Sequence, residues 1–265
     1  MSTIITLTTD FGQRDAYVAA MKGVLLSVTP QAVLVDVSHE ICPQDVMEAA
    51  FVLRSASPLF PEGTVHLVVV DPGVGTTRRP VALRHRDHFF VGPDNGVFSL
   101  VVGDEASTDI VELDRKEFWR VPAPSSTFHG RDIFAPIAAH LAGGKCLSDV
   151  GSPVDRLSSM RWALPSVDEH GVQGWIVHID RFGNCITNIS SEISAELTVT
   201  PGMKCFVGSA VLTQISATYG SVATGEPLLL INSDGFLEIA VNGGSASDLF
   251  GIRRGASVNI VLSLK

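Results

Sequence analysis

Two aspartates at the ends of predicted strands are the first residues that could do chemistry. Asp10 lies in the motif T-T-D-F-G and Asp71 in V-D-P-G-V-G-T, so each follows an apolar stretch and precedes a glycine turn. Ligands of open parallel sheets bind outside the carboxyl ends of the strands, so we expect both carboxylates at one edge of a sheet. Arg78 and Arg79 follow closely enough to reach the same edge. The alternative is that each aspartate only caps a helix or stabilises a turn.

A histidine stands immediately before a predicted helix. His129 lies in F-H-G-R-D, ahead of a helix expected over 130–142. The positive end of a helix dipole disfavours the imidazolium, and a general base must be a neutral imidazole. A purely structural histidine is the alternative. The other histidines have no metal-ligand spacing, so we expect no metal site and disfavour a metal-dependent hydrolase. The chain also lacks the glycine-rich motifs that bind nucleoside triphosphates and dinucleotides.

A polar stretch in the second half could bind a nucleobase. Residues 180–189 read D-R-F-G-N-C-I-T-N-I, which is too polar for an ordinary core strand. The amide of Asn184 both donates and accepts, which suits the amino group and N7 of adenine. Phe182 and Tyr219 could supply a stacking face. The motif N-S-D-G at 232–235 is typical of a hairpin turn.

The elements that must position these residues fall into two classes. Strands expected over 4–9, 32–37 and 64–70 alternate with helices over 15–28 and 43–53, and a hairpin covers 80–91. This alternation predicts an α/β domain with a largely parallel central sheet over 1–143. Residues 144–171 are expected to form a linker or crossing segment. Short apolar runs then predict an all-β, barrel-like domain over 172–265, with a ligand in the cleft between the domains.

Composition restricts the class of protein. The 265 residues are 45% hydrophobic and 18% charged, and 19 Lys and Arg against 28 Asp and Glu give a net charge of −9. This charge lacks the basic footprint of a nucleic-acid binder. The first residues do not resemble a signal peptide, and the apolar runs are too short to span a bilayer. Four cysteines without a C-x-x-C pair favour free, buried thiols in a cytoplasmic protein. We therefore expect an enzyme or a binder of small molecules, without nucleic-acid or membrane partners.

Six motifs in one order resemble a known family. They are T-D-F-G, V-D-P-G-V-G-T-x-R, G-P-D-N-G-V, F-H-G-R-D-I-F-A-P, D-R-F-G-N-x-x-T-N-I and I-N-S…L-E-I-A-V-N, and they cover nearly the whole chain. Together they resemble the S-adenosylmethionine hydroxide adenosyltransferases, relatives of fluorinase and chlorinase. The resemblance implies an α/β domain, a C-terminal β-barrel, and a homotrimer that binds substrate between neighbouring subunits. It also implies hydrolysis of S-adenosylmethionine to adenosine and methionine, with no metal and no cofactor.

The resemblance assigns roles to individual positions. The Asp-Arg-His triad of the family matches Asp71, Arg78 and His129, with the histidine as proton acceptor or relay. The substrate-binding positions that match are Asp10 for the ribose diol, Asp15 and Asp180 for the amino group, Ser233 for the carboxylate, and Phe182, Asn184, Tyr219 and Gly243 for adenine.

Departures from the halogenating relatives favour hydroxide as the nucleophile. Those enzymes carry aromatic and hydroxyl residues where Asp71, His129 and Gly130 stand, and Gln44 replaces a tryptophan that contacts substrate in fluorinase. Asp234 replaces an arginine near the substrate carboxylate. Two alternatives stay open: a halide-dependent, chlorinase-like adenosyltransferase, and a nucleoside-binding sensor without turnover. The complete triad argues against the sensor, because binding alone does not need it.

Overall fold

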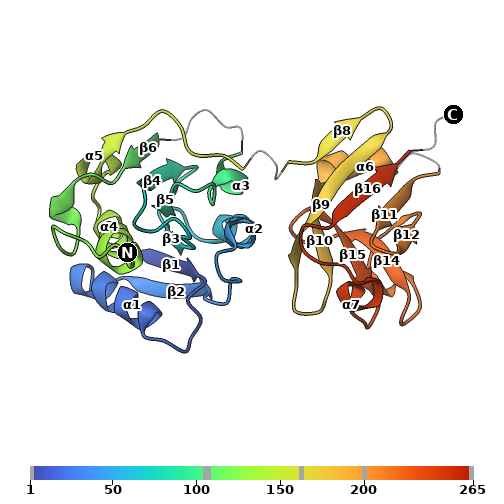
Figure 1. Ribbon diagram of the computed structural model, residues 1–265, viewed down its shortest axis with the longest axis horizontal. Helices are drawn as coiled ribbons and strands as arrows, with labels where there is room; N and C mark the ends of the chain where they lie inside the picture. Colours follow the sequence, from blue (N-terminus) through green and yellow to red (C-terminus); the bar gives the residue numbers. More distant parts are fainter. Residues whose placement is uncertain (1–2, 104–108, 161–163, 199–201, 263–265) are drawn as a thin grey trace. The chain divides into compact units, whose positions relative to one another are not determined.

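The chain folds as two compact units. Figure 1 shows the computed structural model, which describes residues 3–103, 109–160, 164–198 and 202–262. The units are Met1–Met160 and Arg161–Lys265. None of the helices in the described ranges has the length and hydropathy that crossing a bilayer requires.

The first unit contains a seven-stranded mixed sheet. Its strands lie in the order β2-β1-β3-β5-β4-β6-β7. The pairs β1–β2, β1–β3 and β3–β5 are parallel, whereas β4–β5, β4–β6 and β6–β7 are antiparallel. The bounds are β1 Ile4–Thr9, β2 Val33–Ser38, β3 Val65–Val69, β4 Pro80–His85, β5 His88–Pro93, β6 Asp109–Glu112 and β7 Ser152–Pro153. The prediction of a largely parallel sheet is therefore wrong for half of the pairs. A tight turn such as the one between β4 and β5 joins only antiparallel strands.

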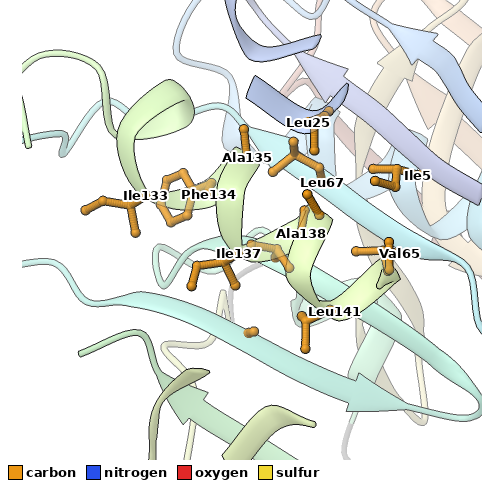
Figure 2. Packing of buried hydrophobic residues seen from close by; sticks show 14 of the residues in the cluster. Ile5, Leu25, Val65, Leu67, Ile133, Phe134, Ala135, Ile137, Ala138 and Leu141 are labelled. Carbon is orange, nitrogen blue, oxygen red and sulfur yellow. The ribbon is translucent and has the colours of Figure 1, made fainter. Parts of the chain in front are cut away.

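Helices cover the sheet of the first unit on both sides. In Figure 1, α1 (Tyr17–Val28) and α4 (Ala135–Ala142) lie on one side, and α2 (Val46–Ala56) and α3 (Ser99–Val102) on the other. The short helix α5 (Leu147–Val150) precedes β7. Figure 2 shows Ile137, Ala138 and Leu141 of α4 packed with Val65 and Leu67 of β3, all buried. This contact fixes the helix that follows His129 against the strand that precedes Asp71.

Helix α2 begins later than the sequence predicts. We expected Pro43 at its start, but the first helical residue is Val46. Asp45 caps the helix, with its side chain accepting a hydrogen bond from the Glu48 N–H at 2.7 Å. Gln44 precedes it with a φ of 66°, outside the helical region. The residues before the cap are therefore a turn, which contacts the end of β1.

The second unit is built on a nine-stranded sheet that is mostly antiparallel. Its order is β12-β11-β16-β9-β10-β15-β14-β13, with β8 paired to β9, and only β13–β14 is parallel. The sheet curls, because β12 at one end also lies near β14. The strands are β8 Ser166–Asp168, β9 Gly171–Ile179, β10 Cys185–Ser190, β11 Lys204–Val207, β12 Ala210–Leu212, β13 Ile215–Ser216, β14 Pro227–Ile231, β15 Phe236–Val241 and β16 Ser257–Val261.

Two features of this unit differ from the sequence predictions. Helices α6 (Ser191–Thr198) and α7 (Ala246–Phe250) interrupt the strands. Strand β10 also runs through a stretch that we judged too polar for a core strand. Its buried polar groups are satisfied: the Thr187 hydroxyl donates to the Leu237 carbonyl at 2.8 Å, and Asn188 Oδ1 accepts from the Trp175 N–H at 2.8 Å. Hydrogen bonding removes most of the cost of burying them.

All four cysteines are free thiols. Cys185 and Cys205 are buried, as predicted, whereas Cys42 and Cys146 are exposed. Burial raises the pKa of both buried thiols to about 12, with Asp180 and Glu238 contributing at Cys185. The expectation of uniformly buried thiols is therefore wrong for half of them.

Candidate functional site

Asp71, Arg78 and His129 form one hydrogen-bonded chain in the first unit. Arg78 Nε donates to both carboxylate oxygens of Asp71, at 2.8 and 3.0 Å, and Nη2 donates to Oδ2. Arg78 Nη2 also lies 3.0 Å from Nδ1 of His129. The side chains of Asp71 and Arg78 are only 5% and 9% exposed. The ion pair is thus largely withdrawn from water, and its charges are less screened than they would be in solvent.

The topology of the sheet places Asp71 beside Asp10. Strands β1 and β3 are parallel neighbours, with Thr9 opposite Val69, so both aspartates follow the carboxyl ends of adjacent strands. Asp10 Oδ2 accepts a hydrogen bond from the Gln44 N–H at 2.8 Å. This bond ties the end of β1 to the turn before α2. Asp15 is exposed, just before α1.

A close approach between two loops brings Arg78 to His129. The loop after β3 turns through a Val74 N–H bond to the Asp71 carbonyl at 3.2 Å. Gly75 has a φ of 76°, and a Cβ there would lie 2.3 Å from the Ser126 carbonyl oxygen. Only glycine fits this contact, which explains the V-G-T sequence of the motif.

The backbone after His129 is a π-helical turn rather than the regular helix start that we predicted. It spans Gly130–Phe134 and continues into α4. Gly130 packs tightly, because a Cβ there would lie 3.1 Å from Val69 and 3.2 Å from Met21. Isolated π-turns are frequent at functional sites because they redirect side chains.

Asp132 holds the loop that carries His129. Its fully buried carboxylate accepts hydrogen bonds from Arg120 Nε at 2.7 Å, from Arg131 Nε and Nη2 at 2.7 and 2.9 Å, and from the Ser125 N–H at 3.0 Å. These bonds hold the pKa of Asp132 far below its usual value, despite burial. Sequence reasoning gave Asp132 no role, although an acid beside an arginine at a predicted helix start was a visible signal.

The surroundings of His129 keep its ring neutral. Burial lowers its pKa, and the neighbouring Arg78 lowers it further, whereas Asp71 and Asp132 act in the opposite direction. Burial and the Arg78 guanidinium are therefore the main reasons why the His129 pKa is lowered and the neutral imidazole is favoured. Arg78 also stacks on Phe134, with its guanidinium carbon 5.1 Å from the ring centroid. Its Nη1 is buried and has no hydrogen-bond partner among the described residues.

Arg79 does not join this chain. Its Nη2 lies 2.5 Å from Asp94 Oδ2 and 2.9 Å from the Arg156 carbonyl. Arg79 therefore lies at the carboxyl end of β5, the parallel neighbour of β3, and contacts Asp94 there rather than Asp71. Asp94 also accepts from the Ser158 N–H at 2.7 Å, so this ion pair fastens a later segment of the chain.

The other predicted site residues lie in the second unit. Asp180 organises the turn between β9 and β10: Oδ1 accepts from the N–H groups of Phe182 and Asn184, and Oδ2 from Nδ2 of Asn184, each at 2.9 Å. Phe182 is 76% exposed, whereas Asn184 is buried. The Tyr219 hydroxyl donates to Glu238 Oε1 at 2.7 Å.

The remaining two positions lie in turns of the second unit. Ser233 is exposed in the turn between β14 and β15, where Asn232 Oδ1 accepts from the Asp234 and Phe236 N–H groups at 3.0 Å. Asn232 thus has the turn-forming role that N-S-D-G predicts. Gly243 lies after β15. In the ranges that the structure describes, no three His, Cys, Asp or Glu side chains are grouped to hold a metal ion.

Comparisons with known proteins identify the family. Residues 5–151 match the N-terminal domain, and residues 174–259 the C-terminal domain, of the SAM hydroxide adenosyltransferases. The chain belongs to this family. A protein of Salinispora tropica named (R)-S-adenosyl-L-methionine hydrolase is 39% identical, covering 97% of each chain. One of the same name from Thermus thermophilus is also 39% identical, over 95% of this chain and 97% of its own.

More distant relatives and a solved structure agree with this membership. Fluorinases of Actinoplanes and Nocardia brasiliensis are 29% and 30% identical to this chain, over 97% of it and 97% and 96% of their own chains. An uncharacterized conserved protein of Thermotoga maritima, 38% identical, has the same fold with a TM-score of 0.89, over 97% of this chain and 99% of its own. Relatives named as hydrolases are thus closer in sequence than those named as fluorinases.

Proposed function

We propose that the protein hydrolyses S-adenosyl-L-methionine to adenosine and L-methionine by in-line attack of hydroxide on the ribose 5′-carbon. The observation that carries the proposal is the buried hydrogen-bonded chain of Asp71, Arg78 and His129. The hydrolase name of relatives that match 97% and 95% of this chain supports the same reaction.

The chemistry needs help at the nucleophile rather than at the leaving group. The sulfonium departs as a neutral thioether, so no acid is required there. Water is a poor nucleophile, because its pKa in bulk is about 15.7. A buried guanidinium stabilises hydroxide and holds it for attack. Arg78 is suited to this role, since its Nη1 is buried without a partner in the described part of the chain.

The contact between Arg78 and His129 specifies how the histidine acts. A guanidinium only donates hydrogen bonds, so Nδ1 of His129 accepts and the neutral ring carries its proton on Nε2. His129 therefore offers an N–H donor and takes up a proton only when Arg78 releases Nδ1. This geometry favours a relay over a simple general base. Asp71 orients Arg78 and balances its charge.

Residues in each unit are proposed to contact the substrate. Asp10 and Asp180 each follow the end of a strand, and Asp15 precedes α1. The exposed Phe182 ring offers a face for the base. The assignments are Asp10 to the ribose diol, Asp15 and Asp180 to the amino group, Ser233 to the carboxylate, and Phe182, Asn184, Tyr219 and Gly243 to adenine. The resemblance to the family supports them.

The same resemblance supports a cytoplasmic homotrimer with its sites at subunit interfaces, and a reaction that needs neither metal nor cofactor. We propose no nucleic-acid partner, because the net charge is −9. Sedimentation of the purified protein tests the trimer. Turnover that survives a chelator tests metal independence.

Product analysis tests the reaction. The protein is incubated with S-adenosyl-L-methionine, with and without chloride, and the products are identified by mass spectrometry. Adenosine and methionine support the proposal. A 5′-halonucleoside would establish a halide-dependent adenosyltransferase, and retained binding without product would establish a sensor.

A further inference from the structure

A buried carboxylate lies in the middle of an otherwise apolar strand of the second unit. Glu238 is 3% exposed in β15, between Leu237 and Ile239, which are fully buried. It is paired with Ile186 of β10 and Leu230 of β14. In the part of the chain that the structure describes, no lysine, arginine or histidine forms an ion pair with it. Such a group costs stability unless it is hydrogen-bonded, so its partners indicate its purpose.

One hydrogen-bond partner of Glu238 is Tyr219, which lies outside the strands of the sheet. Its hydroxyl donates to Glu238 Oε1 at 2.7 Å. Tyr219 lies in a short turn, Tyr219–Ser221, and the residue is 41% exposed. One end of this side chain is therefore anchored to the sheet, while the residue keeps an exposed surface. An aromatic ring held in this way is preorganised to stack on a flat ligand.

The electrostatics keep the tyrosine as a donor. Burial raises the pKa of Tyr219 well above its usual value, and Glu238 and Asp180 add to the effect. Burial also raises the pKa of Glu238; Asp180 and Asp234 raise it further, whereas hydrogen bonds from Tyr219 and Asn232 lower it. Glu238 also acts on the thiol of Cys185, whose pKa it helps to raise. The same Asp180 fixes Nδ2 of Asn184, so both proposed adenine residues belong to one polar cluster.

We propose that Glu238 is a positioning residue of the nucleoside pocket, which fixes the ring of Tyr219 in the orientation that receives a purine base. Glu238 acts through Tyr219 and does not touch the substrate. The proposal rests on the proposed function, because it takes Tyr219 as a wall of the adenine pocket.

Four variants distinguish positioning of the Tyr219 ring by Glu238 from a role of Glu238 in packing alone. Glu238→Gln keeps an oxygen that accepts from the tyrosine hydroxyl, whereas Glu238→Met has similar volume and no such acceptor. Tyr219→Phe removes the donor and keeps the ring. The double variant Glu238→Met with Tyr219→Phe tests coupling. The readouts are the adenosine dissociation constant from calorimetry, and KM and kcat for S-adenosyl-L-methionine.

The expected pattern is a loss of affinity without a loss of turnover. A hydrogen bond and part of a base stack are together worth about tenfold in affinity. Glu238→Met and Tyr219→Phe should each weaken adenosine binding and raise KM by about that factor, with kcat unchanged. The double variant should be no weaker than either single variant, and Glu238→Gln should bind like the parent. Unchanged affinity in both single variants, or a Glu238→Gln variant as weak as Glu238→Met, would overturn the proposal.

A spectroscopic titration tests the contact itself. The chain has two tyrosines, so Tyr17→Phe leaves only Tyr219 to follow by ultraviolet absorbance. In this background the phenol should ionise well above its ordinary pKa of 10.0, and Glu238→Gln should lower that pKa. A phenol that titrates normally would refute the contact. If the parent releases no adenosine from S-adenosyl-L-methionine, the proposed function fails, while adenosine binding and this titration still decide the role of Glu238.

Discussion

The buried ion pair of Asp71 and Arg78 permits a prediction in which stability and activity separate. Asp71→Asn leaves the guanidinium without its counter-charge in a site where it is 9% exposed. Removing one partner of a buried pair costs about 3–5 kcal/mol. For a folding unit of this size, each kcal/mol shifts Tm by about 2–4 °C. The Tm of the first unit should therefore fall by about 6–20 °C, and adenosine release should fall with it.

A second substitution should recover the stability alone. Arg78→Met keeps an aliphatic stem over Phe134 and removes the unpaired charge. The double variant Asp71→Asn with Arg78→Met should therefore unfold at a higher temperature than either single variant, because a neutral pair replaces an isolated charge.

Calorimetry and chromatography of the products measure the two effects, with rates taken below the Tm of each variant. The double variant should still release almost no adenosine, since no guanidinium remains to stabilise hydroxide. A double variant destabilised by the sum of the single effects would refute the account of the pair. A double variant with parental turnover would refute the role of Arg78.

Four further predictions concern His129, Asp132 and His66. His129→Ala should lower kcat by about 10²–10⁴-fold with little change in substrate affinity, and His129→Gln, which keeps an N–H donor, should retain more turnover; equal losses would favour a general base. Because the His129 pKa is lowered, the acidic limb of kcat/KM should lie below 6.5 in a pH–rate profile, and a limb above that value would contradict the neutral ring. Asp132→Ala should lower kcat and cost about 1–3 kcal/mol of unfolding free energy, while adenosine affinity stays constant. Burial and the neighbouring His88 lower the His66 pKa from 6.5 to about 3. Between pH 6.5 and about pH 3 the unfolded chain therefore binds one proton more than the folded chain, and on acidification the free energy of unfolding should fall by about 1.4 kcal/mol per pH unit. Urea unfolding at several pH values should show this slope, and His66→Gln should flatten it.

The sequence was informative where one local pattern decides the structure. The apolar run before Asp10 predicted β1 with its observed bounds, Ile4–Thr9. The position of Asp10 and Asp71 after neighbouring strands followed from the same pattern, because β1 and β3 proved to be parallel neighbours. The triad itself came from the resemblance, and its catalytic role stays a prediction.

Long-range pairing explains what could not be predicted. The polarity of β10 hid a buried strand, since the carbonyl that satisfies Thr187 belongs to Leu237, far along the chain. Arg79 and Arg78 are adjacent in sequence, yet only the three-dimensional position of Asp94 decides that Arg79 pairs with Asp94 rather than with Asp71. Glu238 carried a signal, a single acid in the apolar run F-L-E-I-A-V, but its partner Tyr219 is separated from it by another strand.

Isotope labelling tests the central claim that hydroxide attacks the 5′-carbon. The protein is incubated with S-adenosyl-L-methionine in water enriched in the heavy oxygen isotope, with chloride present, and the products are analysed by mass spectrometry. The account predicts adenosine labelled at its 5′-hydroxyl, together with unlabelled methionine. Unlabelled adenosine, a 5′-chloronucleoside, or no cleavage of the bound substrate would contradict it.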